Sequence, residues 1–299
     1  MLSLTGLIVP LITPFSESNS IDIGILHNLI DHVIEAEADG LIVAASTGEG
    51  LSLSEPERRK LIESSIRSTS NRAKTLVGCS AYGTSSVIEN IKIAASLGAD
   101  GAMITHPYYS LPDERELLNH YEIVTEKTEL PLIIYNNPAT TGIDAKPELI
   151  AKISTFRNVA AIKESSGDCT RVSTIRMLTN RKIPILCGTD NQALEQLSAG
   201  AEGWVAGVAN VIPKECVSLM RLIGKGELRG AQIIFDQIFD YLNLAESTGK
   251  YVQVNRYGLQ KIGIPVGESR LPLLAVNKDL EIQIDAALTK ANFTTVTKS

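Results

Sequence analysis

Residues 158–167 read Asn158-Val159-Ala160-Ala161-Ile162-Lys163-Glu164-Ser165-Ser166-Gly167, a short apolar run that ends at a lysine. An apolar run of this length is typical of a strand that is buried on both faces. Burial at the strand end disfavours the charged ammonium of Lys163, and a neutral lysine amine can form a Schiff base with a carbonyl carbon. The run alone also allows Lys163 to extend its ammonium into water. The other strand ends must decide between these two interpretations.

Seven further apolar runs alternate with amphipathic stretches of helical periodicity. We expect strands within residues 6–15, 40–46, 75–81, 101–109, 130–137, 158–165, 183–189 and 203–211. Helices are expected near residues 22–37, 54–70, 84–97, 113–128, 146–154, 168–179, 190–199 and 213–223. This alternation predicts an α/β fold with a parallel sheet, and eight strands are the number that closes a (β/α)8 TIM barrel. A doubly wound sheet is less favoured because no GxGxxG motif follows the first strand.

The pattern changes after the eighth unit. Only helical periodicity is found in the C-terminal part, near residues 226–248, 250–262 and 279–291. We therefore divide the chain into a barrel, residues 1–224, and a C-terminal helical region, residues 225–299, which packs on the barrel.

Composition limits the possible partners. The chain has 299 residues, 44% hydrophobic content and a net charge of −6, which together describe an ordinary globular protein. The acidic balance argues against a nucleic-acid partner. No apolar run is long enough to span a membrane, and the N-terminus lacks the basic segment of a signal peptide. The four cysteines form no CxxC pair, so we expect a reduced, cytoplasmic location.

The ends of the strands should hold any chemistry, because active sites of TIM barrels lie there. Tyr135 ends the fifth run and Lys163 ends the sixth, so these residues should be neighbours across the sheet. A phenol beside an amine can transfer protons. The stretch Ser46-Thr47-Gly48 can offer hydroxyl and backbone N–H groups to a carboxylate. Taken singly, Tyr135 fits a core position and the loop fits a helix cap; their combination with Lys163 favours a site.

A metal site is not predicted. The histidines are His27, His32, His106 and His120. His27 and His32 are five residues apart in a helical pattern, a spacing that does not place both on one face. Only His106 lies near a strand end, and no carboxylate cluster accompanies it.

Several motifs at the strand ends occur together and in order. They are Ser46-Thr47-Gly48-Glu49, Pro107-Tyr108-Tyr109, Tyr135-Asn136-Asn137-Pro138, Ile162-Lys163-Glu164 and Gly188-Thr189-Asp190. In this combination the chain resembles the dihydrodipicolinate synthase/N-acetylneuraminate lyase family, from about residue 4 to about residue 290. The resemblance implies a (β/α)8 barrel with a C-terminal helical region. It also implies a class I carbon–carbon or carbon–oxygen lyase.

The resemblance implies roles for individual residues. Lys163 would form a Schiff base with pyruvate or another 2-oxo acid, without a further cofactor. Tyr135 would shuttle protons within a relay of Ser46, Tyr135 and Tyr109. The implied substrate-binding residues are Thr47, Gly48, Thr140, Gly188, Asp190 and Val205. In the family, the tyrosine that matches Tyr109 enters from a neighbouring subunit, which implies a homo-oligomer, either a dimer or a tetramer of two tight dimers.

Two positions depart from the family's patterns. Dihydrodipicolinate synthases carry an arginine in the loop after the fifth strand that grips the carboxylate of the aldehyde substrate, and Thr140 occupies that place here. Sialic-acid lyases carry a glutamate where this chain has Asn191. We therefore expect a Schiff-base lyase or dehydratase that acts on pyruvate or a hydroxylated 2-oxo acid. The alternatives are a genuine 4-hydroxy-tetrahydrodipicolinate synthase, a non-catalytic 2-oxo-acid-binding barrel and a phosphate-binding barrel enzyme.

Overall fold

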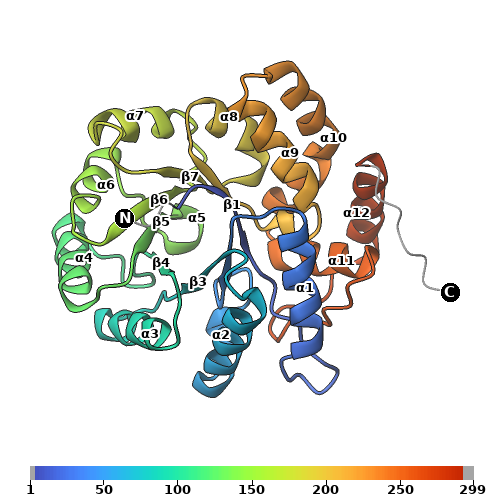
Figure 1. Ribbon diagram of the computed structural model, residues 1–299, viewed down its shortest axis with the longest axis horizontal. Coiled ribbons are helices and arrows are strands. Elements are labelled where there is room, and N and C mark those ends of the chain that lie inside the picture. The colour runs from blue at the N-terminus through green and yellow to red at the C-terminus, as the bar shows by residue number, and fades with distance from the viewer. Residues whose placement is uncertain (1–3, 292–299) are drawn as a thin grey trace.

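The computed structural model describes residues 4–291 and contains a closed barrel of parallel strands (Figure 1). The strands are β1 (Gly6–Pro10), β2 (Gly40–Val43), β3 (Lys74–Gly78), β4 (Gly101–Thr105), β5 (Leu132–Asn136), β6 (Val159–Glu164), β7 (Ile185–Cys187) and β8 (Gly203–Val205). Each strand pairs in parallel with the next, and β8 pairs with β1 to close the ring. The predicted TIM barrel is confirmed.

Helices connect successive strands and surround the barrel (Figure 1). The main ones are α1 (Ile23–Glu35), α2 (Glu55–Thr69), α3 (Thr84–Ser96), α4 (Glu114–Lys127), α6 (Pro147–Ile153), α7 (Thr170–Leu178), α8 (Ala193–Ser198) and α9 (Pro213–Gly224). Short helical turns in the loops are η1 (Gly50–Ser52), α5 (Pro138–Thr141), η2 (Asp190–Gln192) and η3 (Val208–Asn210). The main helices coincide closely with the predicted stretches. Between residues 4 and 291, no helix has both the length and the apolar character needed to cross a membrane.

The helix boundaries follow local signals in the sequence. The backbone N–H of Ser54 donates to Glu57 Oε2 at 2.9 Å, which caps the start of α2. Pro147 opens α6, where its missing N–H costs no helical hydrogen bond. Gly98 and Gly200 follow α3 and α8 with φ angles of 92° and 102°, a region that glycine enters without steric cost. These signals explain why the helices were predicted closely.

The strands end earlier than the apolar runs that predicted them. The first run was expected to reach residue 15, whereas β1 ends at Pro10. Leu11 and Ile12 are nevertheless buried, with exposed fractions of 1% and 0%. Likewise β8 ends at Val205, and the buried η3 turn follows it. The loops at this end of the barrel pack against one another and against the C-terminal helices, so apolar content continues past the strand.

The inside of the barrel has its own apolar core. Its members are Leu4, Ile8, Ile42, Ala45, Leu76, Met103, Ile133, Tyr135, Ala160, Ala161, Leu186 and Val205. Side chains two residues apart on a strand point to the same face. Ala161 and Ile133 belong to this inner core. Lys163 on β6 and Tyr135 on β5, each two residues further along, therefore also point to the inside of the barrel.

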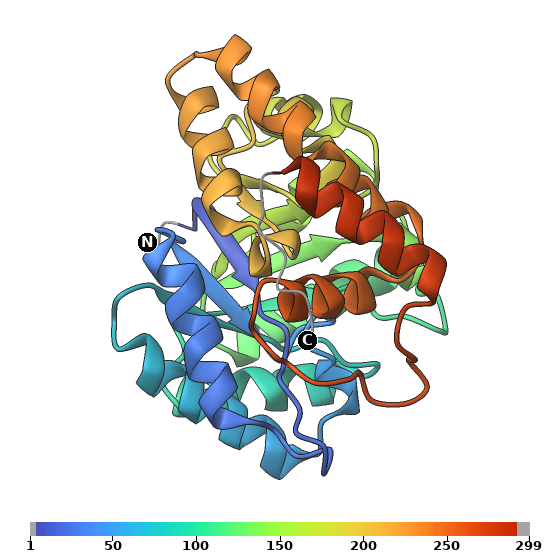
Figure 2. The same ribbon diagram turned by 90° about the vertical axis from the view of Figure 1, so that its right-hand side faces the viewer.

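The C-terminal region consists of α10 (Leu228–Ser247), α11 (Tyr251–Lys261) and α12 (Lys278–Lys290). Figure 2 shows α11 and α12 lying side by side along one flank of the barrel. A buried ion pair ties α11 to the loop after β2: Arg256 Nε lies 2.9 Å from Glu49 Oε1. Arg256 Nη2 also donates to the carbonyl of Thr13 at 2.8 Å. The C-terminal helices are thus fastened to the end of the barrel where the strands terminate.

Candidate active site

Lys163 and Tyr135 meet at the carboxyl ends of β5 and β6. They are direct register partners on the two strands, as the sequence predicted. The Nζ atom of Lys163 lies 3.8 Å from the centroid of the Tyr135 ring. Both side chains are buried, with exposed fractions of 6% and 7%. The barrel interior therefore holds a lysine amine against a phenol, and the water-exposed alternative for Lys163 is wrong.

Glycine at position 188 makes room for the lysine. A Cβ atom on Gly188, just past β7, would lie 2.9 Å from Lys163 Cε and 2.0 Å from Ser165 Oγ. Any side chain at this position would collide with Ser165, with the backbone of Glu164 and with Lys163. The predicted site residue Gly188 is thus adjacent to Lys163.

The loop after β2 forms a tight turn near the same end. Thr13 Oγ1 donates to the carbonyl of Gly48 at 2.6 Å, and the backbone N–H of Glu49 donates to Ser46 at 3.0 Å. A Cβ on Gly48 would lie 2.6 Å from the carbonyl oxygen of Leu11, so the turn needs glycine there. In the described structure, the N–H groups of Thr47 and Gly48 donate to no protein acceptor. These two donors are therefore available to an anion.

A cavity of about 160 Å³ opens beside Tyr135. Most of its lining residues carry hydroxyl groups, among them Ser46, Tyr135 and Thr140, and Met103 adds an apolar wall. Arg58 is the one residue with a formal charge among those that line this cavity. Tyr135 connects the cavity to Lys163, because it lines the cavity and also packs its ring against the amine. We call this cavity, together with Lys163, the mouth site.

Asp190 lies behind the mouth site. One of its carboxylate oxygens accepts from Trp204 Nε1 at 2.8 Å, and the other accepts from the Tyr251 hydroxyl at 2.5 Å. Its backbone N–H donates to Glu246 Oε1 at 2.7 Å. Burial raises the pKa of both acids, that of Glu246 to about 7, while the charge of Lys163 opposes the increase. Asp190 therefore supports the site with both oxygens occupied, and Glu246, Trp204 and Tyr251 are supporting residues that the sequence did not indicate.

His106, the histidine nearest a strand end, is fully buried beside β5. Its Nδ1 lies 2.6 Å from the Tyr121 hydroxyl, and its Nε2 lies 3.1 Å from Asn136 Oδ1. Burial lowers the pKa of His106 to about 4. The His106 imidazole is therefore neutral and forms buried hydrogen bonds with its neighbours. In the part of the chain that the structure describes, no group of three or more His, Cys, Asp and Glu side chains could hold a metal ion.

Three of the ten sequence-predicted site residues, Ser46, Tyr135 and Thr140, line the cavity, and Tyr109 and Val205 are among those that do not. Tyr109 is 90% exposed on its own chain and has a φ angle of 77°, a left-handed conformation that costs energy for a non-glycine residue. Val205 is buried inside the barrel, in the core cluster that also holds Tyr135. The sequence alone could not separate positions that line the cavity from positions that lie in the core or on the surface.

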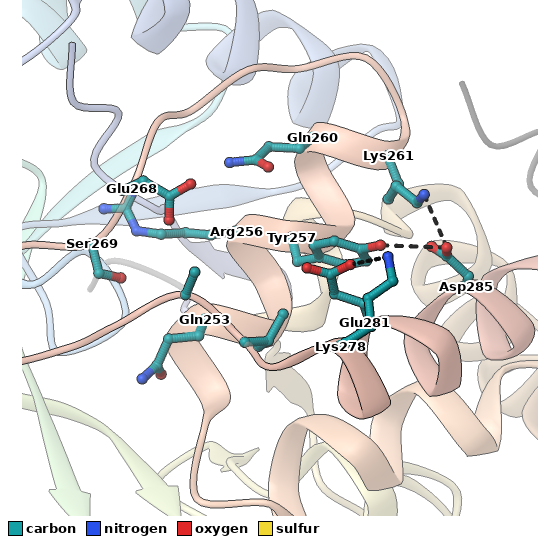
Figure 3. Close-up of a pocket in the computed structure, with 12 residues that line it drawn as sticks. Gln253, Arg256, Tyr257, Gln260, Lys261, Glu268, Ser269, Lys278, Glu281 and Asp285 are labelled. Atoms are coloured by element: carbon teal, nitrogen blue, oxygen red, sulfur yellow. Dashed lines mark hydrogen bonds and ion pairs between the residues drawn. The ribbon is translucent and has the colours of Figure 1, made fainter. Parts of the chain in front are cut away.

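A larger cavity, about 420 Å³ in volume, lies between α11 and α12 (Figure 3). Four of its six charged residues form two ion pairs within the cavity. Lys261 Nζ lies 2.9 Å from Asp285 Oδ2, and Lys278 Nζ lies 2.9 Å from Glu281 Oε2. The hydroxyl of Tyr257 also donates to Asp285 at 3.3 Å. We call this cavity the flank cavity; it contains none of the sequence-predicted site residues.

Fold and site together define a (β/α)8-barrel lyase with its lysine inside the barrel. The chain belongs to the dihydrodipicolinate synthetase family, whose model matches residues 3–291.

Known proteins resemble the chain over almost its whole length. A 4-hydroxy-tetrahydrodipicolinate synthase from Sulfurihydrogenibium sp. is 33% identical over 291 residues, which cover 95% of this chain and 97% of the relative. Among solved structures, dihydrodipicolinate synthase from Aquifex aeolicus matches with a TM-score of 0.92 and 30% identity, covering 98% of this chain and all of the other. The chloride-inhibited enzyme from Acinetobacter baumannii, complexed with pyruvate, matches with a TM-score of 0.93 and 28% identity over 98% of this chain and 100% of that chain.

Proposed function

We propose that this protein is a class I lyase in which Lys163 forms a Schiff base with pyruvate or a related 2-oxo acid. The observation that carries the proposal is the buried contact between the Lys163 amine and the Tyr135 ring, 3.8 Å apart at the ends of adjacent strands. A related enzyme of the same fold, from Acinetobacter baumannii, is described as complexed with pyruvate. Both observations support the donor half of the reaction.

The chemistry follows from the groups around the amine. Nζ of neutral Lys163 adds to the C2 carbonyl carbon, and a proton passes from Nζ to the former carbonyl oxygen to give a carbinolamine. Loss of water then leaves the imine. The Tyr135 oxygen already accepts from Asn137 Nδ2 at 2.7 Å, so its own proton is directed away from that bond and is available for transfer. The free N–H groups of Thr47 and Gly48 would hold the carboxylate of the 2-oxo acid.

The exposed Tyr109 supports an oligomer. We propose that Tyr109 completes the relay of Ser46 and Tyr135 in a neighbouring subunit of a cytoplasmic homodimer or homotetramer. Its 90% exposure on a single chain agrees with a side chain that is buried only on assembly. Sedimentation analysis of wild type and Tyr109→Ala, together with their activities, tests this arrangement; a fully active monomer would contradict it.

Reductive trapping tests the Schiff base directly. Incubation with pyruvate and borohydride should increase the protein mass by one reduced 2-oxo acid, located on Lys163 by peptide mass spectrometry. Lys163→Arg keeps the positive charge and should remain unmodified. If a panel of 2-oxo acids leaves the wild-type mass unchanged, the proposal is wrong, and measurable pyruvate binding without an adduct would favour a non-catalytic binding barrel.

The acceptor half of the reaction has two candidates. The curated relatives are named 4-hydroxy-tetrahydrodipicolinate synthase, which favours that synthesis. Thr140 lies in the short helix α5 on the wall of the mouth site, where a synthase is expected to carry arginine, and this favours another hydroxylated 2-oxo acid. Turnover of pyruvate with the synthase's aldehyde substrate, measured beside a panel of hydroxyaldehydes, decides between the two candidates.

A further inference from the structure

Arg58 is a cavity-lining cation for which the described part of the chain offers no acidic partner. It lies in the first turns of α2 and lines the mouth site together with Tyr135 and Thr140. Both glutamates that precede it in α2 have other partners: Glu55 pairs with Arg59 at 2.9 Å, and Glu57 pairs with Arg270. Within residues 4–291, no ion pair joins the Arg58 guanidinium to a carboxylate.

In the described structure, Nη2 is the one nitrogen of the Arg58 side chain with hydrogen-bond partners. Its Nη2 donates to the carbonyl of Gly78 at the end of β3 and lies 3.8 Å from Cys79 Sγ. Its Nε is buried and has no hydrogen-bond partner among the residues that the structure describes. A buried N–H without an acceptor costs free energy, and a guanidinium has donors suited to the two oxygens of a carboxylate. The Nε–H donor without an acceptor therefore belongs to a residue that lines the cavity of the mouth site.

We propose that Arg58 binds a carboxylate on the acceptor half of the substrate. It would thereby take the role of the arginine that is expected in synthases at the position of Thr140. The inference rests on the proposed Schiff-base function for the donor half. Binding at Arg58 would restrict the acceptor to an aldehyde that bears a carboxylate. In the cleavage direction, the substrate would be a 2-oxo acid with a second carboxylate at its far end. The hydroxyl groups of Ser46, Tyr135 and Thr140 would bind the polar chain between the two ends. Since α2 follows β2 and α5 follows β5, the cation reaches the cavity from a different wall than a residue on α5 would.

The test compares Arg58→Gln with Arg59→Gln. The glutamine amide at position 58 can still donate toward Gly78 but has no charge. Arg59 is the next residue on α2, and its partner Glu55 is 65% exposed, so Arg59→Gln is the matched control. Circular dichroism and thermal unfolding confirm that each variant folds, and an additional Arg58→Lys variant preserves the charge if glutamine is not tolerated.

Two measurements test the role of Arg58 independently of Schiff-base formation at Lys163. With pyruvate as donor, succinic semialdehyde should be used at least tenfold better than butanal by kcat/KM. Arg58→Gln should lower the value for succinic semialdehyde by roughly 10- to 100-fold, the range expected for a charge-assisted hydrogen bond, and leave that for butanal unchanged. Calorimetry with succinate should show binding to wild type and Arg59→Gln that is weakened at least tenfold in Arg58→Gln. Adding Thr140→Arg to Arg58→Gln should restore part of both losses.

The outcomes are distinct. Pyruvate trapping on Lys163 should be equal in wild type and Arg58→Gln, so failure of trapping in wild type contradicts the proposed function and leaves the succinate measurement to judge Arg58. Absence of both succinate binding and a preference for the carboxylated aldehyde in wild type would overturn the inference. An equal loss in Arg58→Gln and Arg59→Gln, or no loss in either, would overturn it as well.

Discussion

The mouth site and the flank cavity differ in what their charged groups contact. The flank cavity has the larger volume, but its lysines are paired with carboxylates of the same cavity (Figure 3). The mouth site is smaller, and its one formally charged lining residue, Arg58, has an unfilled donor. The two cavities therefore differ in whether their cations are paired: both lysines of the flank cavity have carboxylate partners, and Arg58 of the mouth site has none among the described residues.

The same comparison applies to Arg256, which lines the flank cavity and reaches the loop of the mouth site. It connects the two regions through its buried pair with Glu49. Because α11 carries this arginine, the stability of the barrel mouth should depend on a residue far from the chemistry.

The largest expected effect comes from breaking this connection. Arg256→Met leaves the Glu49 carboxylate buried without its partner and should lower the free energy of unfolding by about 3–5 kcal/mol. Urea unfolding measures the loss. The double variant Glu49→Gln/Arg256→Met should recover a large part of it, and a single variant as stable as wild type would show that the pair contributes nothing.

Tyr135→Phe should affect turnover more than stability. Loss of the proton-transferring hydroxyl should lower kcat by roughly 10²-fold or more, while pyruvate trapping continues at a reduced rate. Tyr257→Phe removes a hydroxyl from the flank cavity instead and should leave kcat unchanged. Steady-state kinetics of both variants test the contrast, which would fail if both lost activity equally.

Glu246→Gln should change how stability depends on pH. Burial and the neighbouring Asp190 raise the pKa of Glu246 to about 7 from an ordinary value of 4.5. The folded protein therefore binds more protons there than the unfolded chain between these values, and the contribution of Glu246 to stability declines as the pH rises through this window. Relative to wild type, Glu246→Gln should gain stability of about 1–3 kcal/mol over that range.

Urea unfolding at a series of pH values checks this gain. Glu57→Gln is the control, because its hydrogen bond with Arg270 lowers the pKa of Glu57 to about 2. Glu57 is ionised in the folded protein throughout the window, and in the unfolded chain above about pH 5.5, so its difference from wild type should stay constant over the upper part of the window. A constant difference for Glu246→Gln would contradict the raised pKa.

The smallest effect is expected at the flank cavity. Lys261→Ala breaks a partly exposed pair with Asp285 and should change the free energy of unfolding by less than about 1 kcal/mol. Its kcat/KM should equal that of wild type. A large loss of activity in this variant would mean that the flank cavity communicates with the mouth site.

The sequence was sufficient where the signal is local or repeats. Eight apolar runs with intervening helical periodicity predicted the barrel. Strand order also predicted that Tyr135 and Lys163, at the ends of adjacent strands, lie side by side. The ends of the strands could not be predicted, because Leu11 and Ile12 are as buried in a loop as they would be in a strand.

The supporting residues required the tertiary structure. Glu246 belongs to a C-terminal helix, and nothing in its local sequence distinguishes it from other helical glutamates. Arg58 lies among charged residues of α2, where its neighbours Glu55 and Glu57 suggest ordinary helix pairs. Glu55 forms an ordinary i,i+4 helix pair with Arg59, and only the fold shows that Glu57 pairs with the distant Arg270.

The sequence by itself determined the barrel, the family resemblance and the lysine–tyrosine pair, because periodicity and strand order act along the chain. The tertiary structure decided which groups remain unsatisfied. Burial and pairing depend on residues distant in sequence, as with Asp190 and Glu246 or Glu49 and Arg256. Lys163 could therefore be recognised from its own strand, but the significance of Arg58 appears only when the partners of its neighbours are known.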